Sequence, residues 1–126
     1  MRGIVCLCGS TKFKPLFEEV NRRLTWSGWF VLSVGSFYHS EIDHDVKSEI
    51  IARKKRLDML HKEKIDLSQA IVVLNQDGYI GESTKSEIYH AQNRGKKIYW
   101  WDWSKALYPC LQDDSWQTLL DESDKK

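Results

Sequence analysis

Short apolar runs alternate along this chain with longer segments of mixed polarity. Four of the runs are six to eight residues long and cover residues 3–10, 29–36, 70–75 and 96–101. Runs of this length, rich in Val, Ile and aromatic residues, are typical of strands that are buried on both faces. We therefore predict four strands.

The segments between these runs carry helical signals. Helices are predicted over residues 14–28, 46–65, 83–95 and 115–122, and the segment 37–45 is predicted to be a loop. The first helix is supported by an apolar stripe of Leu16, Phe17, Val20 and Leu24, with Gly28 as its stop signal. The second is supported by a stripe of Val46, Ile50, Leu57 and Leu60, and the third ends at Gly95.

Alternation of strands and helices predicts a parallel sheet that is covered on both faces. Because such crossovers are right-handed, we expect an α/β, doubly wound, three-layer sandwich with four to five parallel strands, of the Rossmann-like or flavodoxin-like kind. The length of 126 residues indicates one domain, with residues 122–126 frayed. Ligands of such folds bind at the carboxyl ends of the strands.

Composition narrows the class of partner. Nineteen basic and 18 acidic residues leave a net charge of +1, which gives no electrostatic reason to expect nucleic acid or an anionic membrane. No apolar run approaches the roughly 18 residues of a membrane span, and the segment before the first strand is too short for a signal peptide. We expect a cytoplasmic protein with reduced thiols at Cys6, Cys8 and Cys110, the first two sharing one face of a strand.

Six tryptophans are the one unusual feature of the composition. Trp100, Trp101 and Trp103 cluster in the segment IYWWDW. These side chains serve either the core and a subunit interface, or a surface on which a planar ring stacks.

Two tripeptides of the same sequence follow strands and precede predicted helices. They are Ser10-Thr11-Lys12 and Ser83-Thr84-Lys85. The free N–H groups of a helix N-terminus suit phosphate, although Ser and Thr are also the usual helix-capping residues. The spacing of a Walker A loop is absent from both.

Glu87 is open to two interpretations. Thr84 and Glu87 match a capping box, in which Glu87 only turns back to its own helix start. Alternatively, Glu87 is a carboxylate at the ligand-binding edge of the sheet, where it could attack an electrophilic sugar carbon.

A second polar group lies on the predicted helix 46–65. Asp58, His61 and Ile65 share one face of that helix. The acid and the histidine either bind sugar hydroxyls and protonate a leaving base, or form an ordinary surface pair. His39, Asp43 and His44 match no metal-site spacing, and His90 is interpreted as a surface histidine, so we expect no metal or organic cofactor.

These segments together resemble the nucleoside 2-deoxyribosyltransferase superfamily, including its deoxynucleoside 5′-monophosphate N-glycosidases. The resemblance rests on CGS after the first strand and on GESTKSEIYHA after the third, and spans roughly residues 4–97. The segment LDMLHKEKIDLSQAIVVLN supports it. It implies cleavage or transfer at the N-glycosidic bond of a nucleoside or nucleotide, and a homo-oligomer.

The resemblance also implies roles for individual residues. Glu87 matches the nucleophile that attacks C1′, and Asp58 matches a sugar-binding aspartate, with His61 as a further catalytic candidate without a secure counterpart. The substrate-binding candidates are Gly9, Ser10, Asn75, Gly81, Ser83 and Thr84.

One departure separates the chain from the family pattern. The family usually carries a first-strand tyrosine that hydrogen-bonds the nucleophile, and here Cys6 lies near that place. Tyr38, Tyr79 and Tyr89 are possible substitutes. Three alternatives therefore stay open: a nucleotide sensor without turnover, an NAD-type glycohydrolase, and an interaction module that uses the Trp-rich strand.

Overall fold

The computed structural model describes residues 2–35 and 47–121, which form a five-stranded, all-parallel sheet with the order β2-β1-β3-β4-β5. This confirms the predicted α/β architecture, and the strand order is the flavodoxin-like one. The strands are β1 (Gly3–Cys8), β2 (Trp29–Leu32), β3 (Ala70–Val73), β4 (Lys97–Trp100) and β5 (Asp114–Ser115).

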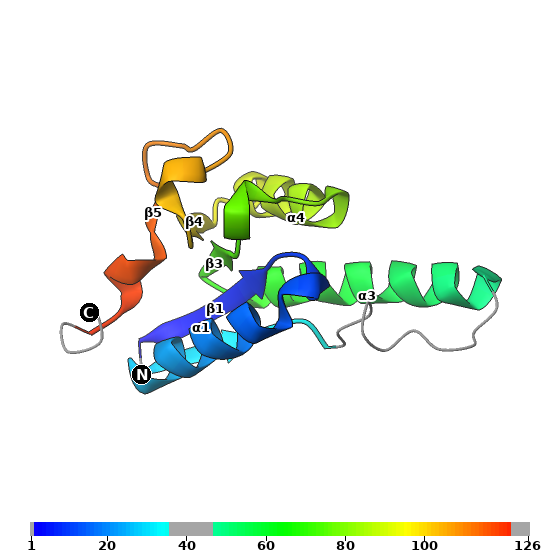
Figure 1. Ribbon diagram of the computed structural model, residues 1–126, viewed down its shortest axis with the longest axis horizontal. Coiled ribbons are helices and arrows are strands. Elements are labelled where there is room, and N and C mark those ends of the chain that lie inside the picture. The colour runs from blue at the N-terminus through cyan, green and yellow to red at the C-terminus, as the bar shows by residue number, and fades with distance from the viewer. Residues whose placement is uncertain (1, 36–46, 122–126) are drawn as a thin grey trace.

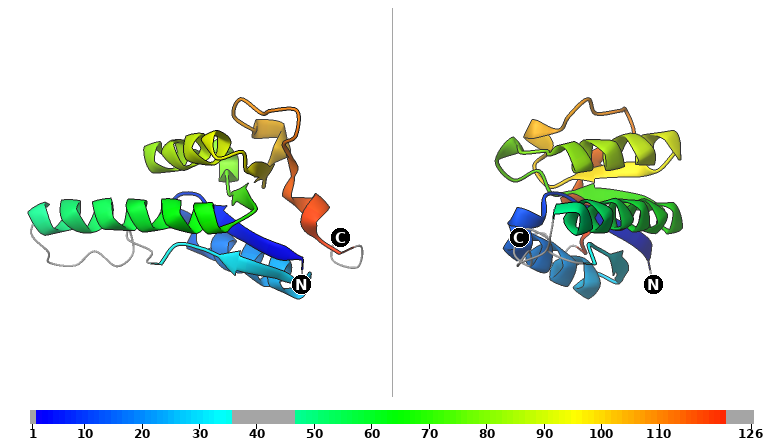
Figure 2. Two further views of the ribbon diagram at one scale, coloured as in Figure 1. Left: turned by 180° about the vertical axis from the view of Figure 1, so that it is seen from behind. Right: turned by 90° about the vertical axis from the view of Figure 1, so that its right-hand side faces the viewer.

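In the described ranges 2–35 and 47–121, three α-helices cover the sheet (Figure 1). They are α1 (Lys14–Trp26), α3 (Lys47–Leu67) and α4 (Glu82–Asn93). Figure 2 shows α1 on one side of the sheet and both α3 and α4 on the other. The order of layers is therefore helix, sheet, helix, as a doubly wound fold requires.

The pleat of β1 divides the core into two layers. Val5 and Leu7 face the α1 side, where they pack with Phe17 and Val20. Cys6 and Cys8 face the opposite side, where α3 and α4 cover them. All four β1 side chains have no exposed surface, and the predicted common face of the two cysteines is confirmed.

The burial pattern of α3 differs from the predicted apolar stripe. Of the predicted stripe, Leu60 is 46% exposed and Ile50 and Leu57 are only partly buried, whereas His61 and Ile65 are buried. Val46 lies outside the described residues. In Figure 1 the N-terminal part of α3 extends beyond the sheet, so that this part has no layer to pack against. Among the described residues of α3, Ile65 belongs to the apolar core.

The C-terminal segment also differs from the prediction. In place of a helix over 115–122, a two-residue strand β5 leads into a single 3-10 turn at Trp116–Leu119. Trp116 and Leu119 nevertheless enter the core on the α1 side. The apolar spacing that predicted a helix is thus satisfied by one turn.

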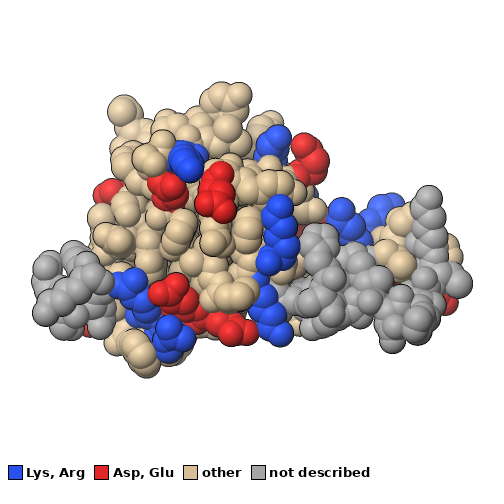
Figure 3. All heavy atoms as spheres, in the orientation of Figure 1, with Lys and Arg blue, Asp and Glu red and all other residues tan. Residues whose placement is uncertain are grey.

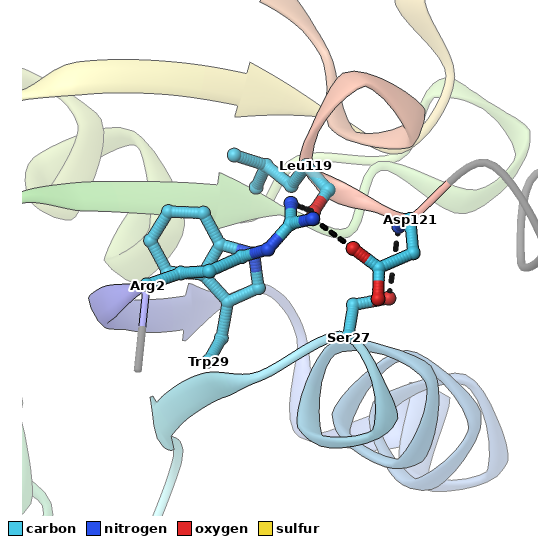
Figure 4. A network of polar contacts seen from close by, with 5 residues as sticks. All are labelled: Arg2, Ser27, Trp29, Leu119 and Asp121. Carbon is cyan, nitrogen blue, oxygen red and sulfur yellow. Dashed lines mark hydrogen bonds and ion pairs between the residues drawn. The ribbon is translucent and has the colours of Figure 1, made fainter.

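A polar network fastens this segment to the N-terminal strand (Figure 4). Arg2 Nη1 and Trp29 Nε1 both donate to the carbonyl oxygen of Leu119, each at 2.9 Å. Arg2 also forms an ion pair with Asp121, whose backbone N–H donates to Ser27 Oγ at 3.1 Å. The two ends of the described chain therefore lie side by side.

The surface carries both signs of charge. Figure 3 shows that acidic and basic side chains are interspersed on one face of the molecule rather than gathered into a field of one sign. In the part of the chain that the structure describes, no helix has the length and apolar character needed to cross a bilayer. The predicted loop 37–45, with His39, Asp43 and His44, lies outside the described residues.

Candidate active site

A pocket of about 320 Å³ opens at the carboxyl ends of β1 and β3. Strand order reverses between these two strands, which is where doubly wound folds bind ligands. The loops after β1, β2 and β3 and the facing sides of α3 and α4 line the pocket. Of the predicted site residues it brings together Gly9, Ser10, Asp58, His61, Gly81, Ser83, Thr84 and Glu87.

The N-terminus of α4 forms one wall of the pocket. The helix begins at Glu82 with Gly81 as its N-cap, and no side chain caps it. The predicted capping box is therefore wrong, because Thr84 already lies in the first turn. The first helical hydrogen bond runs from Lys85 N to Gly81 O at 2.9 Å. The N–H groups of the three preceding helical residues consequently have no acceptor within the helix.

The loop after β1 forms the opposite wall. Ser10 Oγ accepts a hydrogen bond from Lys12 N at 3.4 Å and opens a 3-10 turn, whereas α1 itself begins only at Lys14. The tripeptide therefore opens a separate 3-10 turn, and the α-helix begins at Lys14, where it was predicted. Gly9 is required by close packing, because a Cβ atom there would lie 3.1 Å from Leu74 Cβ and 3.2 Å from Leu74 O.

Glu87 and His61 face each other across the floor of the pocket. Glu87 Oε1 lies 3.8 Å from His61 Nε2, and both side chains are buried. Burial raises the pKa of Glu87 to about 7, and the positive charge of His61 partly opposes this increase. Asp58, half-buried in the same wall, raises it further by like-charge repulsion. Burial lowers the pKa of His61, but contact with Cys6 and the charge of Glu87 outweigh it and leave that pKa raised.

Beneath His61 lie the two thiols of β1. His61 Nε2 is 3.6 Å from Cys6 Sγ and 3.5 Å from Cys8 Sγ. A hydrogen bond from Cys8 lowers the pKa of Cys6 to about 6, while burial holds the pKa of Cys8 well above its usual range. The two thiols therefore differ in acidity, and Cys6 is the more acidic of them.

The structure places Asn75 away from the pocket. Its side-chain N–H groups donate to Asp102 O at 3.0 Å and Lys105 O at 3.2 Å, and its oxygen accepts from Asp102 N at 2.8 Å. All of these bonds connect the ends of β3 and β4. Asn75 is therefore a structural residue and not part of the candidate site.

Nine further residues line the pocket: Thr11, Val34, Gly35, Lys54, Leu57, Leu60, Lys64, Tyr79 and Glu82. Lys54 and Lys64 come from α3, and Tyr79 comes from the loop after β3. The two lysines lie four residues before Asp58 and three after His61, so helical spacing alone could have found them. The Tyr79 ring stacks against the ammonium of Lys12, 3.4 Å from its centroid. Tyr89 is 65% exposed, and Tyr38 lies outside the described residues.

Comparison of the chain with known proteins gives no match: no family model, no characterised protein and no solved structure is recognisably similar to it. The candidate site is therefore interpreted from its own geometry.

Proposed function

We propose that this chain cleaves or transfers at the N-glycosidic bond of a nucleoside or nucleoside 5′-monophosphate, with Glu87 as the nucleophile. One observation carries the proposal. A buried carboxylate and a buried imidazole face each other 3.8 Å apart in a pocket whose wall is an uncapped helix N-terminus. The sequence resemblance supports the same interpretation.

The first chemical step would form a covalent glycosyl ester. A carboxylate oxygen of Glu87 attacks C1′ of the sugar, and the bond from C1′ to the base nitrogen breaks with its electron pair going to the base. Protonated His61 supplies the proton that the departing base takes up. Asp58, on the same face of α3, is placed to accept hydrogen bonds from sugar hydroxyls.

The second step would return the enzyme to its starting state. Water attacks C1′ of the ester, neutral His61 takes up a proton, and the free sugar leaves as Glu87 is regenerated. An acceptor base in place of water gives a transferase. In either case two displacements at C1′ retain its configuration.

The free N–H groups and the positive charges around the pocket favour a phosphorylated substrate. The free N–H groups at the start of α4 and the hydroxyl of Ser83 suit phosphate oxygens. Lys54 and Lys64 add positive charge on the facing helix. A nucleoside 5′-monophosphate would place its phosphate at α4 and its C1′ at Glu87, and this arrangement favours hydrolysis.

A specific feature favours a second candidate function. Thiols, and no phenol, lie beside His61 and Glu87 in the described residues. A thiol does not orient a carboxylate as a tyrosine does. The same pocket could then bind a nucleotide without cleaving it, as a sensor would.

The test is an assay of base release. The protein is incubated with nucleosides, deoxynucleosides, their 5′-monophosphates and NAD, and the free base is separated by chromatography. We expect release from a monophosphate by the wild type and by Glu63→Gln, which changes an exposed carboxylate of α3 outside the pocket, but not by Glu87→Gln. Nicotinamide release from NAD would identify an NAD-type glycohydrolase instead. A monophosphate that raises Tm but releases no base would exclude the enzyme and favour the sensor.

The homo-oligomer implied by the resemblance stays a prediction. Light scattering of the purified protein measures it directly, and a mass of one chain would contradict it.

A further inference from the structure

We infer that Cys6, Cys8 and His61 form a binding site for a thiophilic transition-metal ion, Zn²⁺ in the first place, beneath the floor of the pocket. The donor atoms Cys6 Sγ, Cys8 Sγ and His61 Nε2 all lie within 4.8 Å of one another. Two thiolates and an imidazole are the ligand types that zinc prefers.

The distances match a tetrahedral ion. Bonds of about 2.3 Å to sulfur and roughly 2.0–2.1 Å to nitrogen place the two donors about 3.5 Å apart across a tetrahedral edge. The two sulfur–nitrogen distances here are 3.6 and 3.5 Å. An ion can therefore enter with little movement of the side chains.

The fold holds these donors without depending on a metal. Cys6 and Cys8 alternate along β1, an interior strand of the sheet, so both thiols project toward α3. His61 comes from a buried position of α3 and also lines the pocket. The pocket is therefore the route by which an ion would reach the thiols, which have no exposed surface themselves.

Three protein ligands leave one position of a tetrahedral ion open. Glu87 Oε1 lies 3.8 Å from His61 Nε2, close to the roughly 3.3 Å that separates nitrogen and oxygen donors on one zinc ion. Glu87 or a water molecule would take that position. Binding displaces the thiol protons into solvent.

Metal binding would have a consequence for the chemistry proposed above, and this consequence rests on that proposal. An ion on His61 Nε2 occupies the nitrogen that would protonate the leaving base, so the metal-bound form would not cleave the glycosidic bond. The metal site itself does not depend on the proposed function, because it is measured by spectroscopy.

The test uses Co²⁺ as a spectroscopic probe under reducing conditions. We expect the folded wild-type protein to bind one Co²⁺ per chain, with a near-ultraviolet thiolate-to-cobalt charge-transfer band and the intense visible bands of tetrahedral cobalt. Zn²⁺ should displace the cobalt and abolish both the charge-transfer band and the visible bands. A folded wild-type protein that shows no charge-transfer band would overturn the proposal without any variant.

Matched cysteine variants locate the ligands. Cys110 is free and exposed, so Cys110→Ser should keep the full cobalt spectrum. Cys6→Ser and Cys8→Ser should each weaken binding by about 100-fold or more, beyond the loss typical of an outer-shell partner. His61→Asn should keep the charge-transfer band but shift the visible bands. A spectrum that survives in the Cys6→Ser, Cys8→Ser double variant, or is lost in Cys110→Ser, would contradict the assignment.

Discussion

Burial sets the charge state of Glu87. In water a glutamate is ionised at neutral pH, but the enclosed position between α3 and α4 raises the pKa of this side chain from 4.5 to about 7. The residue on which the proposed chemistry depends is therefore held in a position that opposes its ionisation. Such positions are common at functional sites and lower the stability of the fold.

Because ionised Glu87 destabilises the fold, Glu87→Gln should be more stable than the wild type at a pH where the carboxyl group is ionised. A carboxyl group whose pKa is raised by folding stabilises the protein below the unfolded pKa, and this contribution is lost as the pH rises through the folded value. The variant should match the metal-free wild type below about pH 4, under the unfolded pKa of 4.5. At pH 8 it should be more stable by up to about 3 kcal/mol, because a tenfold change in the ionisation constant corresponds to about 1.4 kcal/mol.

Chemical denaturation at the two pH values measures this difference. Glu82→Gln is the control, since its carboxylate is in the same helix and its side chain is 92% exposed. A variant that is less stable than the wild type at pH 8 would show that Glu87 is a structural partner of His61.

Gly9 offers a second test at the residue scale. An added Cβ would crowd Leu74 and lie 3.4 Å from the Phe17 ring. Gly9→Ala should therefore lower the free energy of unfolding by about 1–2 kcal/mol. At Gly81 the nearest atom would be 3.5 Å away, so Gly81→Ala should lose less stability than Gly9→Ala, because only the preference for Gly over Ala at this N-cap is lost. Equal losses in the two variants would contradict this account of Gly9.

Pairing of α3 with α4 shapes the pocket at the scale of elements. Outside the pocket, Asp66 of α3 accepts a hydrogen bond from His90 of α4 at 2.8 Å, and Arg94 lies 3.7 Å from the same oxygen. The hydrogen bond from His90 lowers the pKa of Asp66. His90, interpreted from the sequence as an ordinary surface histidine, thus connects the two helices.

Asp66→Asn should change how the free energy of unfolding depends on pH in the acid range. Because folding lowers the pKa of Asp66, the stabilisation is present above its unfolded pKa and is lost as the pH falls through the folded value. The wild type should lose more stability than the variant between about pH 5 and pH 2. Melting curves across this range test the expectation, with Glu63→Gln as an exposed control on the same helix; parallel curves for wild type and Asp66→Asn would contradict it.

Elements with a strong apolar pattern could be predicted from the sequence, and weakly patterned ones could not. Four strands and three helices appear where the periodicity placed them. β5 has two residues, too few for any period. The rule that ligands bind at the carboxyl ends of parallel strands predicted Ser10 and Glu87 at one edge of the sheet. Helical spacing, not this rule, selected Asp58, and all three line the same pocket. Asn75 satisfies the same rule by position, but its hydrogen bonds within the loops assign it a structural role.

The burial of His61 could not be predicted from the apolar periodicity of α3. His61 breaks the apolar stripe of α3 as a polar residue, yet it is more buried than Leu60 beside it. The reason is its contact with Cys6 and Cys8, and no local pattern relates a helix residue to a strand some fifty residues away. A contact of this kind is visible only in three dimensions.

At the scale of the whole molecule, the C-terminal segment secures the edge of the α1 layer. Arg2→Ala should remove a hydrogen bond to Leu119 and the ion pair with Asp121. We expect faster amide hydrogen exchange over residues 116–121 and a loss of about 1 kcal/mol in stability. Arg22→Ala, at an exposed position of α1, is the control. Unchanged exchange in Arg2→Ala would contradict a fastening role for this network.

The interior position of β1, between β2 and β3, has a consequence for how the protein is made. β1 is the first of the five strands to leave the ribosome, but its neighbours β2 and β3 lie on either side of it and are synthesised later. His61 and Glu87 emerge later still than β2. During translation the thiols of Cys6 and Cys8 are therefore open to oxidants and metal ions, and the candidate site closes over them only when α4 has been made.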